Sequence, residues 1–309
     1  SPNPVTGRPA WWPRIVGPGR PIDTNRFFVV CANMLGGSMG TTGPASLAPD
    51  GQPYGLRFPM IGVADIVRAQ ALLLEALGID NLFLVIGAGM GGMQALNWAS
   101  AFPKRVFACA SIASAARQPA QNIAFAELGR QAIMADPDWR NGGYIAHGVR
   151  PSRGAAVVRT AARLSGQSGD QVRAIFKNGL AQERLSLAPD TREDRSDPNS
   201  HLYLSRAMDA FDLAADFGGA LANAFQGAQT RHAVFAFSSD WRFPPEESRI
   251  VARALMAAGA EASFLEIKSE HGHDAYLGEE PAFESALTGF VDAAANARGL
   301  GLHGEAQLA

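Results

Sequence analysis

Residues 86–94 read IGAGMGGMQ, a glycine-rich stretch that follows the apolar run 82–87 and opens a helix-like segment. This succession predicts a buried strand, a tight turn and a helix. Enzymes with the pattern Gly-x-Ser-x-Gly at such a turn present the central serine as a nucleophile. Here Gly87 and Gly91 fill the flanking positions, but Gly89 stands where the serine would be. The frame is complete except for its reactive side chain.

Strand-like runs alternate with helix-like segments on both sides of this turn. Such alternation predicts an α/β fold, with a mostly parallel sheet covered by helices on both faces. The expected strands are residues 27–31, 82–86, 106–112, 232–237 and 262–267, all in one sheet, and the expected helices are 59–78, 90–101, 245–258 and 281–297.

The alternation stops between residues 118 and 222, where several helices but no strands are expected. We interpret residues 118–222 as a helical lid inserted into the sheet domain. The lid separates a first part of the core, residues 1–117, from a second part, residues 223–309. Its loosest section is the polar stretch 186–200.

The overall composition argues against several classes of function. A formal net charge of −2 over 309 residues gives no electrostatic case for binding nucleic acid or an anionic membrane. No apolar stretch is long enough to span a bilayer, and no signal peptide is visible. The two cysteines, Cys31 and Cys109, lie in apolar runs. They predict buried free thiols in a reducing compartment, and we expect a cytoplasmic protein.

Two further positions belong with the glycine-rich turn, because the carboxyl ends of parallel strands meet at one edge of a sheet. Asp240 follows the expected strand 232–237, and His273 follows the expected strand 262–267. The order of nucleophile position, acid and histidine is that of a catalytic triad. His273 would take a proton from a nucleophile or water, and Asp240 would orient its ring. The Met90 N–H would stabilise an oxyanion.

Each feature has a simpler explanation when it is taken alone. Asp240 could be a loop or capping residue, and His273 an ordinary hydrogen-bonded loop histidine. A single Gly-x-Gly-x-Gly could also belong to a dinucleotide-binding loop. Residues 87–92 do not follow a first strand, however, and no acidic residue ends a strand near residue 110. Taken together, order and spacing favour a site derived from a triad.

Several longer stretches extend this pattern over most of the chain. They include GTTGPAS (40–46), RAQALLLEALGI (68–79), GMGGMQALNWA (89–99), SSDWRFPPEES (238–248) and HGHDAYL (271–277). On these stretches the chain resembles the homoserine O-acetyltransferases of the α/β-hydrolase superfamily. The resemblance implies transfer of an acyl group to a hydroxyl of an amino acid or related small molecule. It implies acetyl-CoA or another acyl-CoA as co-substrate, with no bound cofactor and no metal.

The resemblance also implies roles for individual residues. It implies a triad of Ser, Asp and His, of which this chain supplies Asp240 and His273. It places Arg130 and Asp274 near the amino-acid substrate, although Arg130 could instead form an ion pair on a helix surface. A homodimer formed through the lid is a further implication.

The chain departs from the family pattern in three places. Gly89 replaces the nucleophile, and the lid section 160–198 is shorter and diverged, which leaves the choice of substrate open. In the family, early strands and an oxyanion loop precede the region of Trp11, and residues 1–10 cannot supply them. We therefore expect that residue 1 is not the natural start. The missing strands would come from an upstream segment, on the same chain or as a separate N-terminal fragment.

Gly89 is compatible with the fold but not with the covalent chemistry of the family. Gly89 can adopt the positive φ of such a turn without steric cost, so the turn survives while the hydroxyl and the covalent step are lost. Neither Ser239 nor either cysteine has a spacing that would let it substitute. Three functions follow: an inactive or severely impaired acyltransferase, a pseudoenzyme that binds a ligand or partner, or a hydrolase or lyase that uses His273 and Asp240 without an acyl-enzyme.

Overall fold

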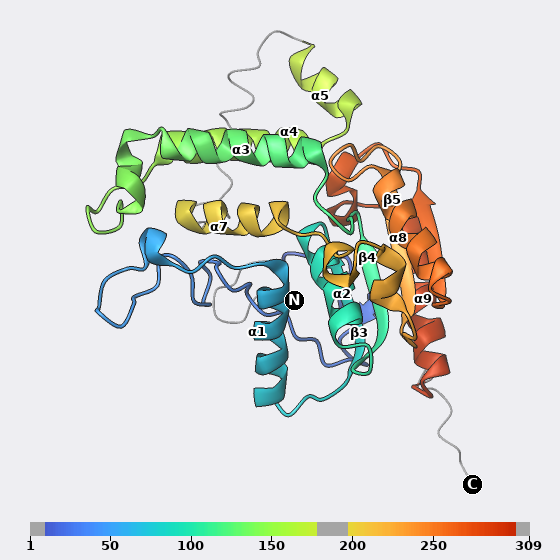
Figure 1. Cartoon of the computed structure of the whole chain (residues 1–309). Helices are drawn as coiled ribbons and strands as arrows, with labels where there is room; N and C mark the ends of the chain where they lie inside the picture. Colours follow the sequence, from blue (N-terminus) through green and yellow to red (C-terminus); the bar gives the residue numbers. More distant parts are fainter. Residues whose placement is uncertain (1–9, 178–196, 301–309) are drawn as a thin grey trace.

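The computed structural model describes residues 10–177 and 197–300, and its centre is a four-stranded sheet (Figure 1). Neighbouring strands are all parallel, in the order β3-β4-β5-β6. Each connection between them therefore crosses over the sheet, as the expected alternation of strands and helices requires. The strands are β3 (Leu82–Ala88), β4 (Val106–Ile112), β5 (Arg231–Phe237) and β6 (Ala262–Ile267), and β1 (Val16–Gly17) and β2 (Ile22–Asp23) form a separate two-residue pair.

The helices begin where local signals predict. Proline occupies the first position of α7 (Pro198–Asp209), α8 (Pro245–Ala257) and α9 (Pro281–Ala297), where a missing N–H costs no helical hydrogen bond. Before α1, the Gly62 N–H donates to the Asp65 carboxylate over 2.8 Å, so this helix starts four residues later than predicted. The two remaining helices near the sheet are α1 (Val63–Ala76) and α2 (Met90–Ala101).

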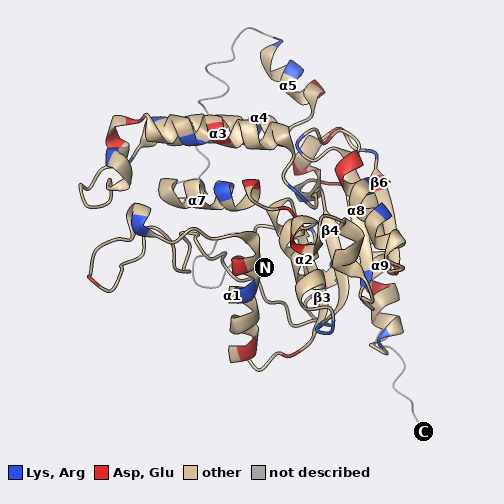
Figure 2. Ribbon diagram, in the orientation of Figure 1, with Lys and Arg blue, Asp and Glu red and all other residues tan. Residues whose placement is uncertain are grey.

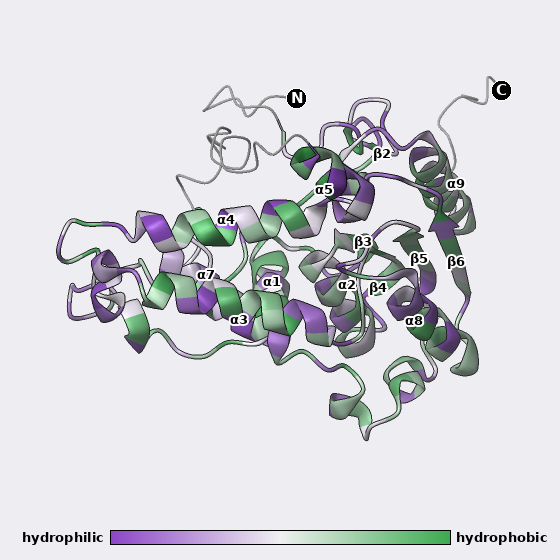
Figure 3. Cartoon of the chain, turned by 90° about the horizontal axis from the view of Figure 1, so that it is seen from above, coloured by the Kyte–Doolittle hydropathy of each residue, from purple (hydrophilic) through white to green (hydrophobic). Residues whose placement is uncertain are grey.

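Helices cover both faces of the sheet, and successive strand residues point to opposite layers. Along β5, Phe235 and Phe237 each pack against Phe283 of α9, with ring centroids 5.4 Å apart. Val234 belongs instead to the core cluster that contains Val251 of α8. Figure 3 shows α9 and α8 on opposite sides of β5 and β6. Burial on both faces explains the largely apolar sequences of the two central strands, β4 and β5.

The strand predicted at residues 27–31 is wrong. These residues form no strand, and Phe28 is 84% exposed. Its backbone forms no ladder with any strand of the described ranges, and an apolar run without a pairing neighbour cannot form a sheet. Phe27 is anchored by stacking on Phe83, with ring centroids 5.0 Å apart.

The two cysteines differ in burial, because Cys109 lies in a paired strand and Cys31 does not. Cys31, in the unpaired run, is exposed, so its predicted burial is wrong. Cys109 lies inside β4 and is buried as predicted, and burial raises the pKa of its thiol to about 12. A buried thiol of such high pKa is unreactive, and it is not a substitute nucleophile.

Between β4 and β5 the described residues form helices and no long strand, as predicted. In Figures 1 and 3, α3 and α4 lie side by side away from the sheet. Gly154 permits this contact, since a Cβ there would lie 2.5 Å from the Ala132 carbonyl oxygen. The predicted loose section falls partly outside the described residues. These helices are α3 (Ala120–Met134), α4 (Ser152–Gly166), α5 (Gly169–Phe176) and α7.

The limits of the lid at residues 118 and 222, the dimer and the upstream segment stay predictions. Acidic and basic residues are mixed along the ribbon drawn in Figure 2. Among the helices of the described ranges, none combines the length and the apolar character that crossing a membrane would require.

His232, near the start of β5, is a buried polar group without a partner. The residue is only 2% exposed, and within the described ranges neither ring nitrogen forms a hydrogen bond. The ring packs edge-on against Phe225, with centroids 5.6 Å apart. Burial lowers the pKa of His232 to about 4, because the charged imidazolium would lose its hydration.

Because His232 is buried in its neutral form, we predict that the protein loses stability in mild acid. Between pH 6.5 and about 4 the unfolded chain binds a proton at His232 that the folded chain excludes, so the free energy of unfolding falls as the pH falls. The contribution is on the order of 3 kcal/mol, because each unit of difference in pKa corresponds to about 1.4 kcal/mol. Urea unfolding at several pH values, with His232→Leu for comparison, tests this. The free energy of unfolding of the variant should decline less steeply below pH 6.5. The difference between the two proteins at pH 8 gives the effect of the substitution on packing alone. Equal slopes for both proteins would contradict the assignment.

Candidate active site

The turn between β3 and α2 consists of Gly89 alone. Its φ of 54° and ψ of −119° lie in a region that L side chains rarely adopt. The backbone segments on either side of Gly89 also lie close together, because a Cβ on Gly87 would lie 2.2 Å from the backbone of Gly91. This is the strained strand–turn–helix geometry that the sequence predicts, and glycine adopts it without strain.

Ser114 supports this turn from the loop after β4. Its hydroxyl donates to the Gly89 carbonyl oxygen over 2.7 Å, and its own carbonyl accepts from the Ser248 hydroxyl over 3.2 Å. Gly92 packs closely on the same side chain, since a Cβ there would lie 2.5 Å from the Ser114 Cβ. The preceding residue, Ala113, has a φ of 45° and completes a strained loop. These contacts fix the turn against the neighbouring strand.

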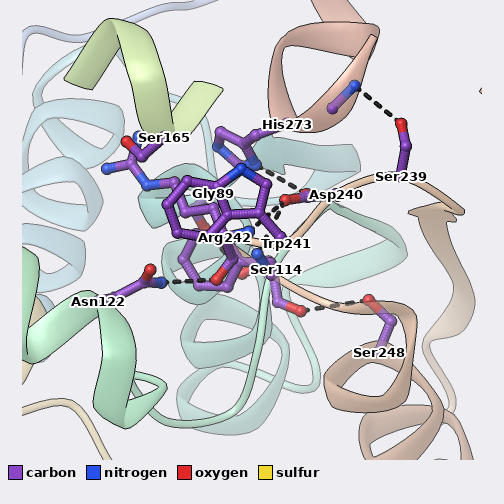
Figure 4. Close-up of polar contacts among 12 residues, drawn as sticks. Gly89, Ser114, Asn122, Ser165, Ser239, Asp240, Trp241, Arg242, Ser248 and His273 are labelled. Carbon is purple, nitrogen blue, oxygen red and sulfur yellow. Dashed lines mark hydrogen bonds and ion pairs between the residues drawn. The ribbon is translucent and has the colours of Figure 1, made fainter. Parts of the chain in front are cut away.

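The acid and the histidine meet beside the turn (Figure 4). Asp240 follows β5, and His273 lies in a short 3₁₀ helix after β6, η6 (Gly272–Leu277). His273 Nδ1 lies 2.9 Å from Asp240 Oδ2, and the two residues are only 4% and 2% exposed. The predicted hydrogen bond is therefore present. It orients the imidazole and leaves Nε2 free for chemistry.

The other carboxylate oxygen of Asp240 is also occupied. Asp240 Oδ1 accepts the backbone N–H groups of Arg242 and Phe243, each over 2.9 Å. These bonds hold the loop after β5 in one conformation. Phe243 and Tyr276 then enclose the imidazole of His273, with ring centroids 5.3 and 5.5 Å away. The position of the histidine is thus determined from three sides.

His273 faces Gly89. A Cβ on Gly89 would lie 3.3 Å from His273 Nε2 and 4.0 Å from the Phe243 ring. A hydroxyl attached to that Cβ would be within hydrogen-bonding reach of the imidazole. Met90 begins α2, and helix-terminal N–H groups have no partner within the helix and carry partial positive charge. The geometry at residues 89, 90, 240 and 273 is that of a triad site without its nucleophile.

Arg130 is neither an exposed ion pair nor a free side chain. The residue is 4% exposed, and its guanidinium contacts Asp209 of α7 over 2.7 Å and Glu127 over 2.8 Å. It also donates to the Ser205 hydroxyl over 3.2 Å. Burial raises the pKa of Asp209, and Arg130 opposes that shift. Arg130 therefore joins α3 to α7, and its predicted contact with substrate would compete with these bonds.

Asp274 follows His273 and lies against the end of α4. A Cβ on Gly166 would lie 2.5 Å from its carboxylate, so the glycine makes room for it. The residue is accessible to solvent, but the surrounding protein partly desolvates its carboxyl and raises the pKa. The charges of His273 and Arg242 oppose this rise. Asp274 thus lies next to His273 in η6, and its contact with an amino-acid substrate stays a prediction.

Comparison with known proteins identifies the family. A family model described as "alpha/beta hydrolase fold" matches residues 6–280. The homoserine O-acetyltransferase of Mesorhizobium japonicum is 52% identical, over 96% of this chain and 81% of that protein. That of Caulobacter vibrioides is 51% identical, over 97% of this chain and 83% of that protein. This chain belongs to the homoserine O-acetyltransferase family. Its α/β-hydrolase fold is confirmed.

Solved structures show the same fold. Esterase E22 is 28% identical and superimposes with a TM-score of 0.82, covering 94% of this chain and 85% of its own. The homoserine O-acetyltransferase of Bacillus anthracis superimposes with a TM-score of 0.85 at 24% identity. The arrangement of the sheet and helices therefore recurs in proteins named as transferases and as esterases.

Two features of the site in this member of the homoserine O-acetyltransferase family have no clear signal in the sequence. Ser114 supports the turn, but a single serine after a strand carries no motif. Arg242 lies two residues after Asp240, with its carbonyl accepting from the Asn122 amide over 2.8 Å. The short distance in the sequence between Arg242 and Asp240 is the signal that could place Arg242 near the site.

Proposed function

We propose that this chain is an acyltransferase of the homoserine O-acetyltransferase type that has lost its covalent step and is severely impaired. The observation that carries the proposal is the 3.3 Å between His273 Nε2 and the position of a Cβ on Gly89. His273 is hydrogen-bonded to Asp240, and the residue that its Nε2 faces, Gly89, has no side chain. No acyl group can be held at residue 89, because glycine offers no oxygen to accept it.

The remaining route is direct transfer. His273 would take the proton from the hydroxyl of an amino-acid acceptor, and that oxygen would attack the thioester carbonyl of an acyl-CoA. The C–O bond forms, the C–S bond breaks, and the proton passes from His273 to the departing thiolate. The Met90 N–H would stabilise the oxyanion. Direct transfer requires both substrates to be bound at once. It also lacks the covalent intermediate that would divide one difficult step into two easier ones, so we expect it to be slow.

Hydrolysis is the second candidate. It needs only a water molecule in place of the acceptor hydroxyl, activated by the same His273–Asp240 pair. The similarity to a protein named esterase E22, at 28% identity, favours this alternative. Both candidates share the base and exclude an acyl-enzyme.

The experiment is a measurement of CoA release from acetyl-CoA, with and without L-homoserine, combined with intact-mass spectrometry. We expect no acyl adduct at any time and a slow release that His273→Ala lowers by about 10²-fold or to background. His147→Ala, at an exposed loop position, is the matched control and should change nothing. A dependence on L-homoserine indicates transfer, and its absence indicates hydrolysis. A trapped acyl adduct, or release that ignores His273→Ala, would overturn the proposal.

A further inference from the structure

Three consecutive side chains tie the segment that carries His273 to the loop after β5. The Ser238 hydroxyl accepts the Ser269 N–H over 3.1 Å and donates to the Ser269 carbonyl over 3.2 Å. The Ser239 hydroxyl accepts the N–H of the residue before His273 over 2.9 Å, and Asp240 lies 2.9 Å from the imidazole itself (Figure 4). The segment is therefore held at successive points along its backbone, up to the base.

Glu280 contacts the same segment through a buried carboxylate. It lies immediately before α9, and the residue is only 7% exposed. Its Oε1 accepts a hydrogen bond from the Ser269 hydroxyl and lies 2.7 Å from His271 Nδ1. The Ser269 hydroxyl also accepts the His271 N–H over 3.1 Å. One carboxylate thus holds, through one hydroxyl, the backbone two residues before the base.

The residue that precedes the base cannot be positioned by its own side chain. Gly272 has a φ of 67°, and a Cβ there would lie 2.4 Å from the carbonyl carbon of Gln167 in the lid. The conformation of this segment therefore depends on its hydrogen bonds. Removal of one member of such a buried network leaves the others unsatisfied, so the whole segment should shift.

The histidines at positions 271 and 273 have similar partners but different surroundings. Each ring presents Nδ1 to a carboxylate, over 2.7 Å for His271 and 2.9 Å for His273. The side chain of His271 is 52% exposed, whereas that of His273 is 5% exposed. Of the two rings, it is His273 that faces Gly89. The contact between His271 and Glu280 can therefore affect the chemistry through the backbone, but not by direct contact with residue 89.

We propose that Glu280 is a positioning residue for His273 and that it acts through Ser269. The inference rests on the proposed function in taking His273 as the base. Glu280 anchors Ser269 to the start of α9, and this anchor aligns the imidazole with Asp240 and with residue 89. Its loss should lower the reactivity of the site, because a misplacement of about 1 Å can slow a reaction by about 100-fold.

The first test is the downfield proton NMR signal of the His273 Nδ1–H in its bond to Asp240. His273→Gln should remove this signal and His271→Gln should retain it, which distinguishes it from a signal of the His271–Glu280 pair. We expect Glu280→Leu and Ser269→Ala to broaden or remove the signal, because the bond opens and the proton exchanges with water. Glu280→Gln keeps an acceptor oxygen and should retain the signal.

The second test is the rate at which a fluorophosphonate labels a chain that carries Gly89→Ser. Adding Glu280→Leu or Ser269→Ala should slow labelling by about 10- to 100-fold, and adding Glu280→Gln by less than about threefold. Thr230→Val is the matched control for both tests. It removes a buried hydroxyl that donates to the Val106 carbonyl over 2.8 Å, at the end of β5 remote from the site, and should change neither readout.

The proposal is overturned if folded Glu280→Leu and Ser269→Ala keep the NMR signal and leave the labelling rate unchanged. If Glu280→Leu does not fold, Ser269→Ala decides. An equal effect of Thr230→Val on both readouts would also overturn the proposal, since the cause would then be a general loss of stability. If Gly89→Ser itself stays unlabelled, the proposed function fails, and the NMR signal of the otherwise unaltered chain still decides the role of Glu280.

Discussion

Gly89→Ser is expected to create a covalent acyl-enzyme step and to raise the rate of CoA release from acetyl-CoA by about 10³-fold or more. The Cβ of the new serine would lie 3.3 Å from His273 Nε2, so its hydroxyl meets a base that Asp240 already orients. The backbone at residue 89, with φ 54°, already has the conformation that the turn demands. The substitution therefore adds the missing group without rebuilding the site.

The measurement is a pre-steady-state assay of CoA release with intact-mass detection. The serine variant should show a burst followed by an acetyl adduct that L-homoserine discharges. Gly89→Ala is the matched control, because it has the same positive φ, at a cost of about 1–2 kcal/mol, without a hydroxyl. A folded serine variant with no burst and no adduct would show that more than the nucleophile is absent.

Arg130→Met is expected to lower the free energy of unfolding by about 3–5 kcal/mol. The methionine fills much of the space but leaves Asp209 without its cationic partner, and one oxygen of that carboxylate already has no hydrogen bond within the described ranges. An isolated buried charge is costly because it has lost its hydration. The contact between α3 and α7 should loosen first.

Urea denaturation followed by circular dichroism measures this effect. Arg68→Met removes a comparable pair with Asp65 on the exposed face of α1 and should change the free energy by less than about 0.5 kcal/mol. The double variant Arg130→Met with Asp209→Leu should recover part of the loss, since no unpaired charge remains. Equal small effects of Arg130→Met and Arg68→Met would show that Arg130 has no structural role.

The sequence predicts those parts of the site that depend on local geometry or on strand order. The turn at Gly89 follows from the spacing of its glycines. Asp240 and His273 can be predicted because both follow strands whose carboxyl ends share one edge of the sheet. Neither prediction needs knowledge of distant contacts.

The remaining features depend on neighbours that no local pattern specifies. The run that contains Phe28 has the composition of a strand, but pairing decides whether it becomes one. Arg130 has the spacing of a helix-surface residue, and its burial depends on how α7 packs against α3. Ser114 and Arg242 act through contacts with residues far away in the sequence. Tertiary packing therefore decides these cases.

The most direct test of the central claim, that this is a triad site lacking only its nucleophile, is labelling with a serine-directed fluorophosphonate and intact-mass detection. We predict one adduct per chain on Gly89→Ser, mapped to residue 89, and none on the unaltered chain. We also predict none on Gly89→Ser combined with His273→Ala. Labelling of the unaltered chain at another residue, or a folded Gly89→Ser variant that stays unlabelled, would contradict it.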